Sequence, residues 1–378
     1  MSKASAAPAI RAFRWSRPLL VLVVPLSALV LAASFGSDII QLVMEFMLVN
    51  LIVVIGIQLF VGNSGVLSFG HLTFMAMGAY TSALLTIPER SKRFMLPELP
   101  GWLMSAHLST ELAVLIAAAA AGVVGLLIAI PLMRLNGIAA SIATFAVLIV
   151  AQVVLSNWTS VTRGTQTMIG VPLDTTMWSA FAWVVVALVV AYVFQGSRVA
   201  LRLRATREDE VAARSAGIGV VRERCIAFAI SAALVAIGGS LYGHLLGAFS
   251  PDAFYLTLTF TCVAMLVIGG IRSLAGAVVG VVAVTAISQL LIQLEAGVAV
   301  GATTIAAPAG FHEVGLAVAM LAILVLRPEG LTGGREFFAL GSGARPVTKP
   351  GTQPDKVAGR ADNEAPAVPR SKASAGDE

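Results

Sequence analysis

Long runs of apolar residues, separated by short polar stretches, organise this chain. Each run extends for about 20 residues, the length that crosses the hydrocarbon core of a bilayer as a helix. The runs are continuous rather than alternating, which excludes a transmembrane barrel and leaves helices as the spanning elements. The pattern therefore predicts an all-α, polytopic membrane protein with about ten spans. We place them at residues 19–35, 39–61, 66–87, 112–134, 136–157, 179–195, 225–248, 254–271, 274–294 and 312–326.

Small residues recur four positions apart inside two of these runs. Gly239, Gly243 and Gly247 form one series, and Gly276 and Gly280 form another. Such spacing places small residues on one helix face and lets membrane helices approach closely. We therefore predict tight helix crossings at both series.

Composition agrees with a membrane protein. Of the 378 residues, 58% are hydrophobic and 12% charged, whereas about 25% are charged in soluble domains. Cys225 and Cys262 lie among apolar residues, and we expect both to pack rather than to form a disulfide or bind metal. The four histidines show no metal-ligand spacing, and no aromatic–basic pattern indicates nucleic-acid binding. We expect lipid, and no nucleic acid, around the chain.

The positive charges between the spans predict the orientation. Lysine and arginine favour cytoplasmic loops, and the bias is strongest when the N-terminus is inside. The cytoplasmic set is then Lys3, Arg11, Arg14, Arg17, Arg134, Arg272, Arg327, Arg335 and the seven arginines of residues 196–224, against Arg90, Lys92, Arg93 and Arg163 outside. Ten spans return the C-terminus to the same side, so both termini are predicted to be cytoplasmic. A signal peptide ending near Ala32–Ser34 is the alternative for the first span.

Three regions follow from this pattern. Residues 1–18 form a cytoplasmic N-terminal segment, and residues 19–332 form the transmembrane domain. Residues 333–378 are rich in proline and in charges of both signs, so they cannot bury enough apolar surface to order themselves. We expect them to be a disordered cytoplasmic tail.

Residues 196–224 form a charged island between two apolar runs, with seven arginines and four acidic residues. A short helix is predicted to begin near Asp209 or Glu210, where acidic side chains favour the positive end of a helix. Ala212, Ala213 and Ala216 would give it a small face that enters a groove on a partner, and Gly217 would end it. The island is therefore the candidate element for coupling to another protein. Its candidate residues are Arg207, Glu210, Ala212, Ala213, Arg214 and Gly217.

A second candidate site is the glycine-rich, polar stretch of residues 62–71. Such backbone is tolerated at membrane depth only where protein or a water-filled cavity covers it. It is therefore either a lining of the translocation pathway or a plain tight turn. Glu45 is added because ionisable groups inside a membrane are often functional. The candidate pathway residues are Glu45, Gly62, Asn63, Gly65, Ser68, Gly70, His71 and Tyr80.

No catalytic constellation is present in the sequence. The phosphate-binding pattern G-x-x-x-x-G-K-[ST] is missing, and Gly217-Ile-Gly219 lacks the strand and third glycine of a dinucleotide site. We therefore predict a transport subunit without a cofactor of its own rather than an enzyme.

Several motifs resemble those of branched-chain amino acid ABC importer permeases of the LivM type. The segment Gly62-Asn-Ser-Gly65-Val-Leu-Ser68-Phe-Gly70-His71, continued by Met77-Gly-Ala-Tyr80, is similar to that family's G-x-x-G-x-L-S-x-G-H…GAY signature. Further similar segments are 131–138, 162–172, 207–218, 250–251 and 269–276. The resemblance covers about residues 40–332. It implies transport of leucine, isoleucine and valine across a bacterial inner membrane, the residue 207–218 segment being the coupling loop. It also implies a homologous second permease, two cytoplasmic ATPase subunits that use the ATP, and an extracytoplasmic solute-binding protein.

Two departures leave alternatives open. Arg163 and Arg272 stand where family members often carry glycine and a small or apolar residue, respectively. Relatives in the same superfamily carry urea, short amides or aromatic acids, so these substrates remain alternatives. A stand-alone secondary transporter is the alternative from another class. That reading requires a relay of buried acids, for which only Glu45 and Glu295 are candidates.

Overall fold

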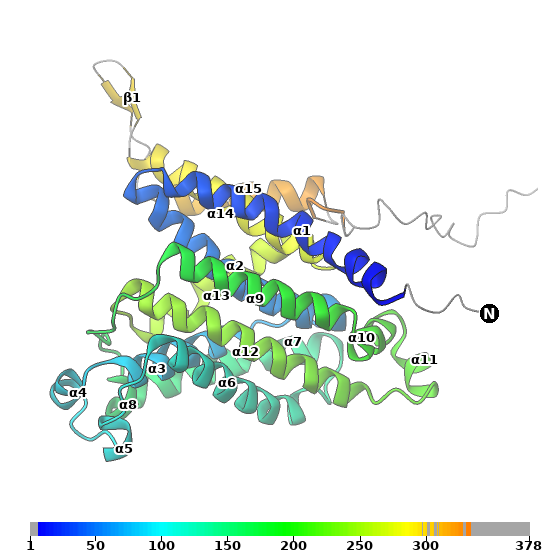
Figure 1. Ribbon diagram of the computed structural model, residues 1–378, viewed down its shortest axis with the longest axis horizontal. Helices are drawn as coiled ribbons and strands as arrows, with labels where there is room; N and C mark the ends of the chain where they lie inside the picture. The colour runs from blue at the N-terminus through cyan, green and yellow to red at the C-terminus, as the bar shows by residue number, and fades with distance from the viewer. Residues whose placement is uncertain are drawn as a thin grey trace, which may run out of the picture. The chain divides into compact units, whose positions relative to one another are not determined.

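The computed structural model describes residues 7–333, except 297, 301–302, 306–307, 309 and 328–329. Within this part of the chain, seven helical segments are long and apolar enough to cross a membrane. They are α2 (Asp38–Ser64), α6 (Thr110–Leu132), α7 (Gly137–Asn157), α9 (Met177–Gln195), α12 (Val220–Leu246), α13 (Leu256–Gly269, preceded by the 3-10 turn η1, Pro251–Phe254) and α14 (Leu274–Ala296). Each overlaps a predicted span, so the chain is a helical, multi-pass membrane protein (Figure 1).

The other three predicted spans coincide with helices that are short or have a shorter apolar part. These helices are α1 (Ala7–Ser34), α3 (His71–Thr86) and α15 (Phe311–Leu326). The apolar part of α1 is Leu19–Ser34, although the helix itself begins at Ala7, within the predicted N-terminal segment. The predicted span 66–87 becomes helical only at His71, because residues 65–70 adopt non-helical backbone. The count of ten crossings stays a prediction.

Short elements connect the long helices. They are α4 (Glu89–Met95), α5 (Gly101–Met104), α8 (Thr159–Thr162), α10 (Arg198–Glu208), α11 (Glu210–Ser215) and the antiparallel strands β1 (Val298–Val300) and β2 (Thr303–Ile305). The sequence pattern did not predict this hairpin. The remainder of the predicted tail, residues 334–378, lies outside the described residues.

Loops predicted to share one side of the membrane lie at the same end of the helix bundle. At one end, which we call the α11 end, the last turn of α2 at Gly62 approaches the backbone of Ile271 and accepts a hydrogen bond from Arg207. Thr332, which follows α15, donates to the carbonyl of Gly269 at that end. Figure 1 shows α10 and α11 opposite α4, α5 and α8. Which end faces the cytoplasm stays the prediction made from the charges.

Helix α12 is the centre of the bundle and packs against α2, α3 and α6. Its small residues explain this position. A Cβ on Gly239 would lie 1.9 Å from the carbonyl oxygen of Met75 on α3. The hydroxyl of Ser231 donates to the carbonyl of Gly56 on α2 at 2.6 Å. Small side chains thus let backbones meet, and hydroxyls satisfy polar groups between them.

Helices approach closely at both predicted glycine series, whereas Gly247 has a different role. A Cβ on Gly280 of α14 would lie 2.0 Å from the carbonyl oxygen of Met265 on α13, and Gly276 contacts the backbone of Gly269 and Gly270. Close packing at Gly239, Gly276 and Gly280 is therefore confirmed. Gly247, by contrast, caps the C-terminus of α12 with a φ of 68° and is not part of a helix face.

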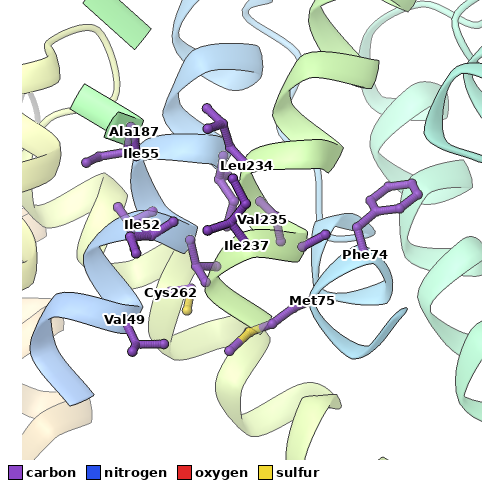
Figure 2. Packing of buried hydrophobic residues seen from close by; sticks show 14 of the residues in the cluster. Val49, Ile52, Ile55, Phe74, Met75, Ala187, Leu234, Val235, Ile237 and Cys262 are labelled. Carbon is purple, nitrogen blue, oxygen red and sulfur yellow. The ribbon is translucent and has the colours of Figure 1, made fainter. Parts of the chain in front are cut away.

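The apolar side chains between these helices form one buried cluster. Figure 2 shows Ile52, Val235 and Cys262, from α2, α12 and α13, among its members. Cys225 and Cys262 are both buried and have free thiols, as expected for packing residues.

At the end opposite α11, a buried lysine organises the loop that contains α4 and α5. Lys92 is fully buried, and its Nζ donates to the carbonyls of Leu103 at 3.1 Å and Ala106 at 2.5 Å. The lysine therefore ties α4 to the segment after α5. Its neighbour Arg93 is exposed and forms a helix-surface pair with Glu89.

We expect Lys92→Met to loosen this loop. The substitution leaves two partly buried carbonyls without their donor, which costs about 1–3 kcal/mol. Chymotrypsin added to the side that carries the loop should then cleave faster after the exposed residues Phe94 and Trp102. Arg93→Met is the matched control, since an exposed pair contributes about 0–1 kcal/mol. Equal cleavage of the two variants would contradict this role of Lys92.

Candidate functional site

The charged island folds into two short helices separated by one capping residue. Ser197 caps α10 by accepting from the backbone N–H of Ala200 at 3.2 Å. Asp209 is extended, with a φ of −151°, and its Oδ1 accepts from the N–H of Ala212 at 2.9 Å. An aspartate at this position satisfies a free N–H and places negative charge at the positive end of the helix. The predicted helix start near Asp209 or Glu210 is confirmed.

Gly217 ends α11 as predicted. It has a φ of 80°, which side chains with a Cβ rarely adopt. The N–H of Gly217 donates to the carbonyl of Arg214 at 2.9 Å, and that of Ile218 donates to Ala213 at 3.1 Å. These two bonds satisfy carbonyls at the end of the helix. The chain then turns directly into α12.

The outward face of α11 differs in one residue from the expected docking face. Val211, Ala212, Ser215 and Ala216 are exposed, and Val211 is 76% exposed. Ala213, which we expected on this face, is only 5% exposed and packs inward. Helix α11 has only six residues, and its contact with the helix bundle determines that Ala213 lies on the inner side. A bulky residue at Ala213 would therefore disturb the anchoring of α11, whereas one at Ala212 or Ala216 would alter its outer face.

Glu210 joins α11 to α12. Its Oε1 accepts from Arg214 at 2.5 Å, within the same helix, and its Oε2 accepts from Arg224 at 3.0 Å. Burial alone would raise the pKa of the Glu210 carboxyl, but the hydrogen bond from Arg214 and the charge of Arg224 outweigh it and lower that pKa. Because the folded-state pKa is lowered, this stabilisation is present at neutral pH and is lost as the pH falls through the lowered value.

Helix α12 holds the island with two consecutive residues. Glu223 is buried and accepts from Arg202 of α10 at 2.8 Å. Arg224 is also buried and donates to Asn136, just before α7, at 2.9 Å, in addition to its contact with Glu210. Sequence reasoning did not select Glu223, Arg224 or Asn136 as site residues. The available signal was their position at the membrane boundary, where a buried charge needs a partner.

Arg207 connects the charged island to the second candidate site. Its Nη1 donates to the carbonyl of Gly62 at 2.6 Å, across 145 residues of sequence. Its methylenes cover Gly65, where a Cβ would lie 2.5 Å from the Arg207 Cγ. The guanidinium also bonds Glu208, and these hydrogen bonds lower the pKa of the Glu208 carboxyl. The structure therefore brings the two predicted sites into contact.

The stretch of residues 62–71 closes the connection between α2 and α3 with local hydrogen bonds. The side chain of Asn63 donates to the carbonyl of Leu59, and Ser64 accepts from the N–H of Val66. Ser68 lies 2.7 Å from the Nδ1 of His71. Gly62, Asn63, Ser68, Gly70 and His71 are buried, and only Gly65 is exposed among the predicted residues of this stretch.

His71 lies in the interior of the bundle. Its ring centroid is 4.9 Å from that of Phe228 and 5.5 Å from that of Phe60. Its exposed fraction is 0%. His71 therefore packs between α2 and α12.

Tyr80 and Glu45 lie apart from this stretch. Tyr80 is buried, with ring centroids 5.1 Å from Phe249 and 6.5 Å from Phe254. Glu45 is half-buried on α2 and accepts a backbone hydrogen bond from Met177, at the start of α9. That position favours a carboxylate at the positive end of a helix. The structure thus separates Glu45 and Tyr80 from residues 62–71, and their role in a pathway stays a prediction.

A model of the family described as "Branched-chain amino acid transport system / permease component" matches residues 39–326. The chain belongs to this family. The match runs from α2 to the end of α15 and includes α10, α11 and the stretch of residues 62–71. The transport permease function of the family agrees with the multi-pass helical fold.

Two curated relatives support the same assignment. Both are named "High-affinity branched-chain amino acid transport system permease protein LivM". The one from Salmonella typhimurium is 29% identical over 261 residues, covering 60% of this chain and 57% of the relative. The one from Escherichia coli is 29% identical over 271 residues, covering 62% and 59%. The chain thus aligns with less than two thirds of the length of these relatives. No solved structure matches it.

Proposed function

We propose that this family member is a membrane-spanning permease subunit of an ATP-driven importer in a bacterial inner membrane. Its substrates are leucine, isoleucine and valine. The family match along residues 39–326 carries the proposal, and the names of the LivM relatives support the substrate class. Its partners are a homologous second permease, two cytoplasmic ATPase subunits and an extracytoplasmic solute-binding protein.

The geometry at the α11 end supports the coupling part of this proposal. The chain has no G-x-x-x-x-G-K-[ST] loop, so energy from ATP must arrive through contact with another subunit. Helix α11 is capped at both ends and exposes Val211, Ala212 and Ala216. A small, rigid, exposed helix fits a groove on an ATPase. Glu210 then links this helix to α12, and Arg207 links the preceding helix α10 to α2.

The pathway part of the proposal concerns residues 62–71 and their neighbours. Apart from Gly65, the candidate residues of this stretch are buried in this structure, so they act when the helices around them separate. An apolar, glycine-rich route with few charges suits aliphatic side chains. Discrimination among related solutes then depends on the solute-binding protein as well as on the permease.

Uptake measurements test the substrate class directly. Cells with and without the gene should be compared for uptake of labelled valine, urea and benzoate. We expect gene-dependent, ATP-dependent valine uptake, with ATPase subunits recovered when the protein is purified from native membranes. Gene-dependent uptake of urea or benzoate instead would assign the importer a different substrate class. Concentrative uptake by the chain alone in vesicles, driven by an ion gradient, would show a secondary transporter and contradict the proposal.

A further inference from the structure

Arg224 lies at the start of α12, between two elements that are distant in sequence. It is 3% exposed. One guanidinium nitrogen, Nη2, donates to Oε2 of Glu210 on α11 at 3.0 Å, and the other, Nη1, donates to Oδ1 of Asn136 at 2.9 Å. A guanidinium is planar, remains charged and presents its donors in a fixed fork. It therefore joins α11 and the start of α7 through one rigid group.

The contact with Asn136 replaces a common helix-capping arrangement. Asn136 occupies the N-cap position of α7 with a φ of −118°, but its side chain makes no capping hydrogen bond. An asparagine there usually accepts from a backbone N–H of the first turn. Its Oδ1 accepts from Arg224 instead. The start of α7 is thus held by α12 rather than capped by its own side chain.

Helix α7 leads from this joint to the predicted pathway stretch. It is the least buried of the seven long segments in the described part of the chain, so few contacts resist its displacement. Phe69 donates its N–H to the hydroxyl of Thr144 on α7 at 3.3 Å. A Cβ on Gly70 would lie 2.5 Å from the carbonyl oxygen of Thr144. A shift of α7 therefore acts directly on residues 69–70.

We propose that Arg224 is a positioning residue that transmits displacement of α11 to α7, and through α7 to the Phe69–Gly70 segment. The inference rests on the proposed function, which supplies the ATPase that displaces α11. Arg214 also binds Glu210, but its contact stays within α11. Arg224 carries the motion from α11 to α7, whereas Arg207 connects α10 to Gly62 of α2.

The first test is Arg224→Gln in the complete complex, purified with its native partners and reconstituted in vesicles. Valine uptake and ATP hydrolysis are measured in the same vesicles. We expect the valine transported per ATP hydrolysed to fall by about tenfold, because a buried, charged hydrogen-bonding partner is lost. The ATPase subunits should remain bound. Arg222→Gln is the matched control, since Arg222 is exposed on the same turn of α12, and it should keep the wild-type ratio.

A second variant keeps the test decisive if Arg224→Gln does not fold. Asn136 is exposed, so Asn136→Ala removes one acceptor of Arg224 and leaves its contact with Glu210. We expect a similar fall in transport per ATP, and recovery in Asn136→Asp, which keeps an acceptor oxygen. A wild-type ratio in Asn136→Ala, or loss of the ATPase subunits from that complex, would overturn the transmission role. Absence of ATP-driven uptake by the wild-type complex would instead remove the proposed function.

Distance measurements separate transmission from simple stabilisation. Glu208, next to the Asp209 cap of α11 and outside the proposed ATPase-binding face, has a side chain that is 68% exposed, and Ile138 on α7 is 79% exposed. Both native cysteines are buried. Spin labels at cysteines introduced at these two positions should keep one distance with and without ATP in the otherwise wild-type complex. In Asn136→Ala the distance should broaden or shift when ATP is added. A distance that changes with ATP before Asn136 is altered would contradict joint movement of α11 and α7.

Discussion

Replacing Gly239 by alanine is expected to remove most of the folded protein from the membrane. The added Cβ would lie 1.9 Å from the carbonyl oxygen of Met75 on α3. A backbone atom cannot rotate away, so α3 and α12 must separate. Their separation also strains the bond from Ser240 to the carbonyl of Gly78. We expect a loss of about 3 kcal/mol, at the upper end of the usual range for overpacked interiors, which is a large part of a typical folding free energy.

The measurement is membrane abundance together with the thermal midpoint of the detergent-solubilised protein. Gly122→Ala is a matched control, because it makes the same change on α6 against the same helix. Its Cβ would lie 3.4 Å from the Cβ of Ala233, an ordinary contact. We expect this variant to accumulate like the wild type. Equal abundance and equal midpoints for the two variants would show that α3 and α12 do not cross as closely as described.

Gly217→Pro is expected to abolish transport while the protein remains inserted. Proline fixes φ near −65° and has no N–H, whereas Gly217 has a φ of 80° and donates to Arg214. The end of α11 must therefore unwind, and its outer face is lost. Because the change lies outside the membrane helices, the bundle should still fold. We expect uptake to fall by at least about tenfold, since a proline in such a position costs roughly 3 kcal/mol.

Valine uptake should be compared at equal membrane abundance, with recovery of the ATPase subunits measured in parallel. Gly217→Asn is the informative comparison, since asparagine tolerates positive φ and no atom lies within 4 Å of the position that a Cβ would occupy. That variant should retain most of the uptake. Wild-type uptake by Gly217→Pro would remove α11 from the coupling mechanism.

The predictions about the site that depend on local interactions agree with the structure. Features that depend on contacts between residues far apart in the sequence were not predicted. The start of α11 at Glu210 and its end before Gly217 depend on caps within a few residues, so the local sequence was sufficient. The inward position of Ala213 depends on contact with the bundle, and the periodicity of a six-residue helix is too short to reveal it. The burial of His71 against Phe228 likewise joins residues that only the fold brings together.

The sequence by itself determined the seven long apolar helical segments and the position of the short helix α11. A helix satisfies its own backbone hydrogen bonds. Hydropathy and capping residues along one segment are therefore sufficient to predict whether it forms a helix and whether that helix is apolar enough to lie in lipid. Only the tertiary structure decided how those segments meet: that Arg207 reaches the carbonyl of Gly62 and that Arg224 joins Glu210 to Asn136. Such contacts depend on the close approach of helices far apart in the chain, which is set by the shapes of facing side chains rather than by any local pattern.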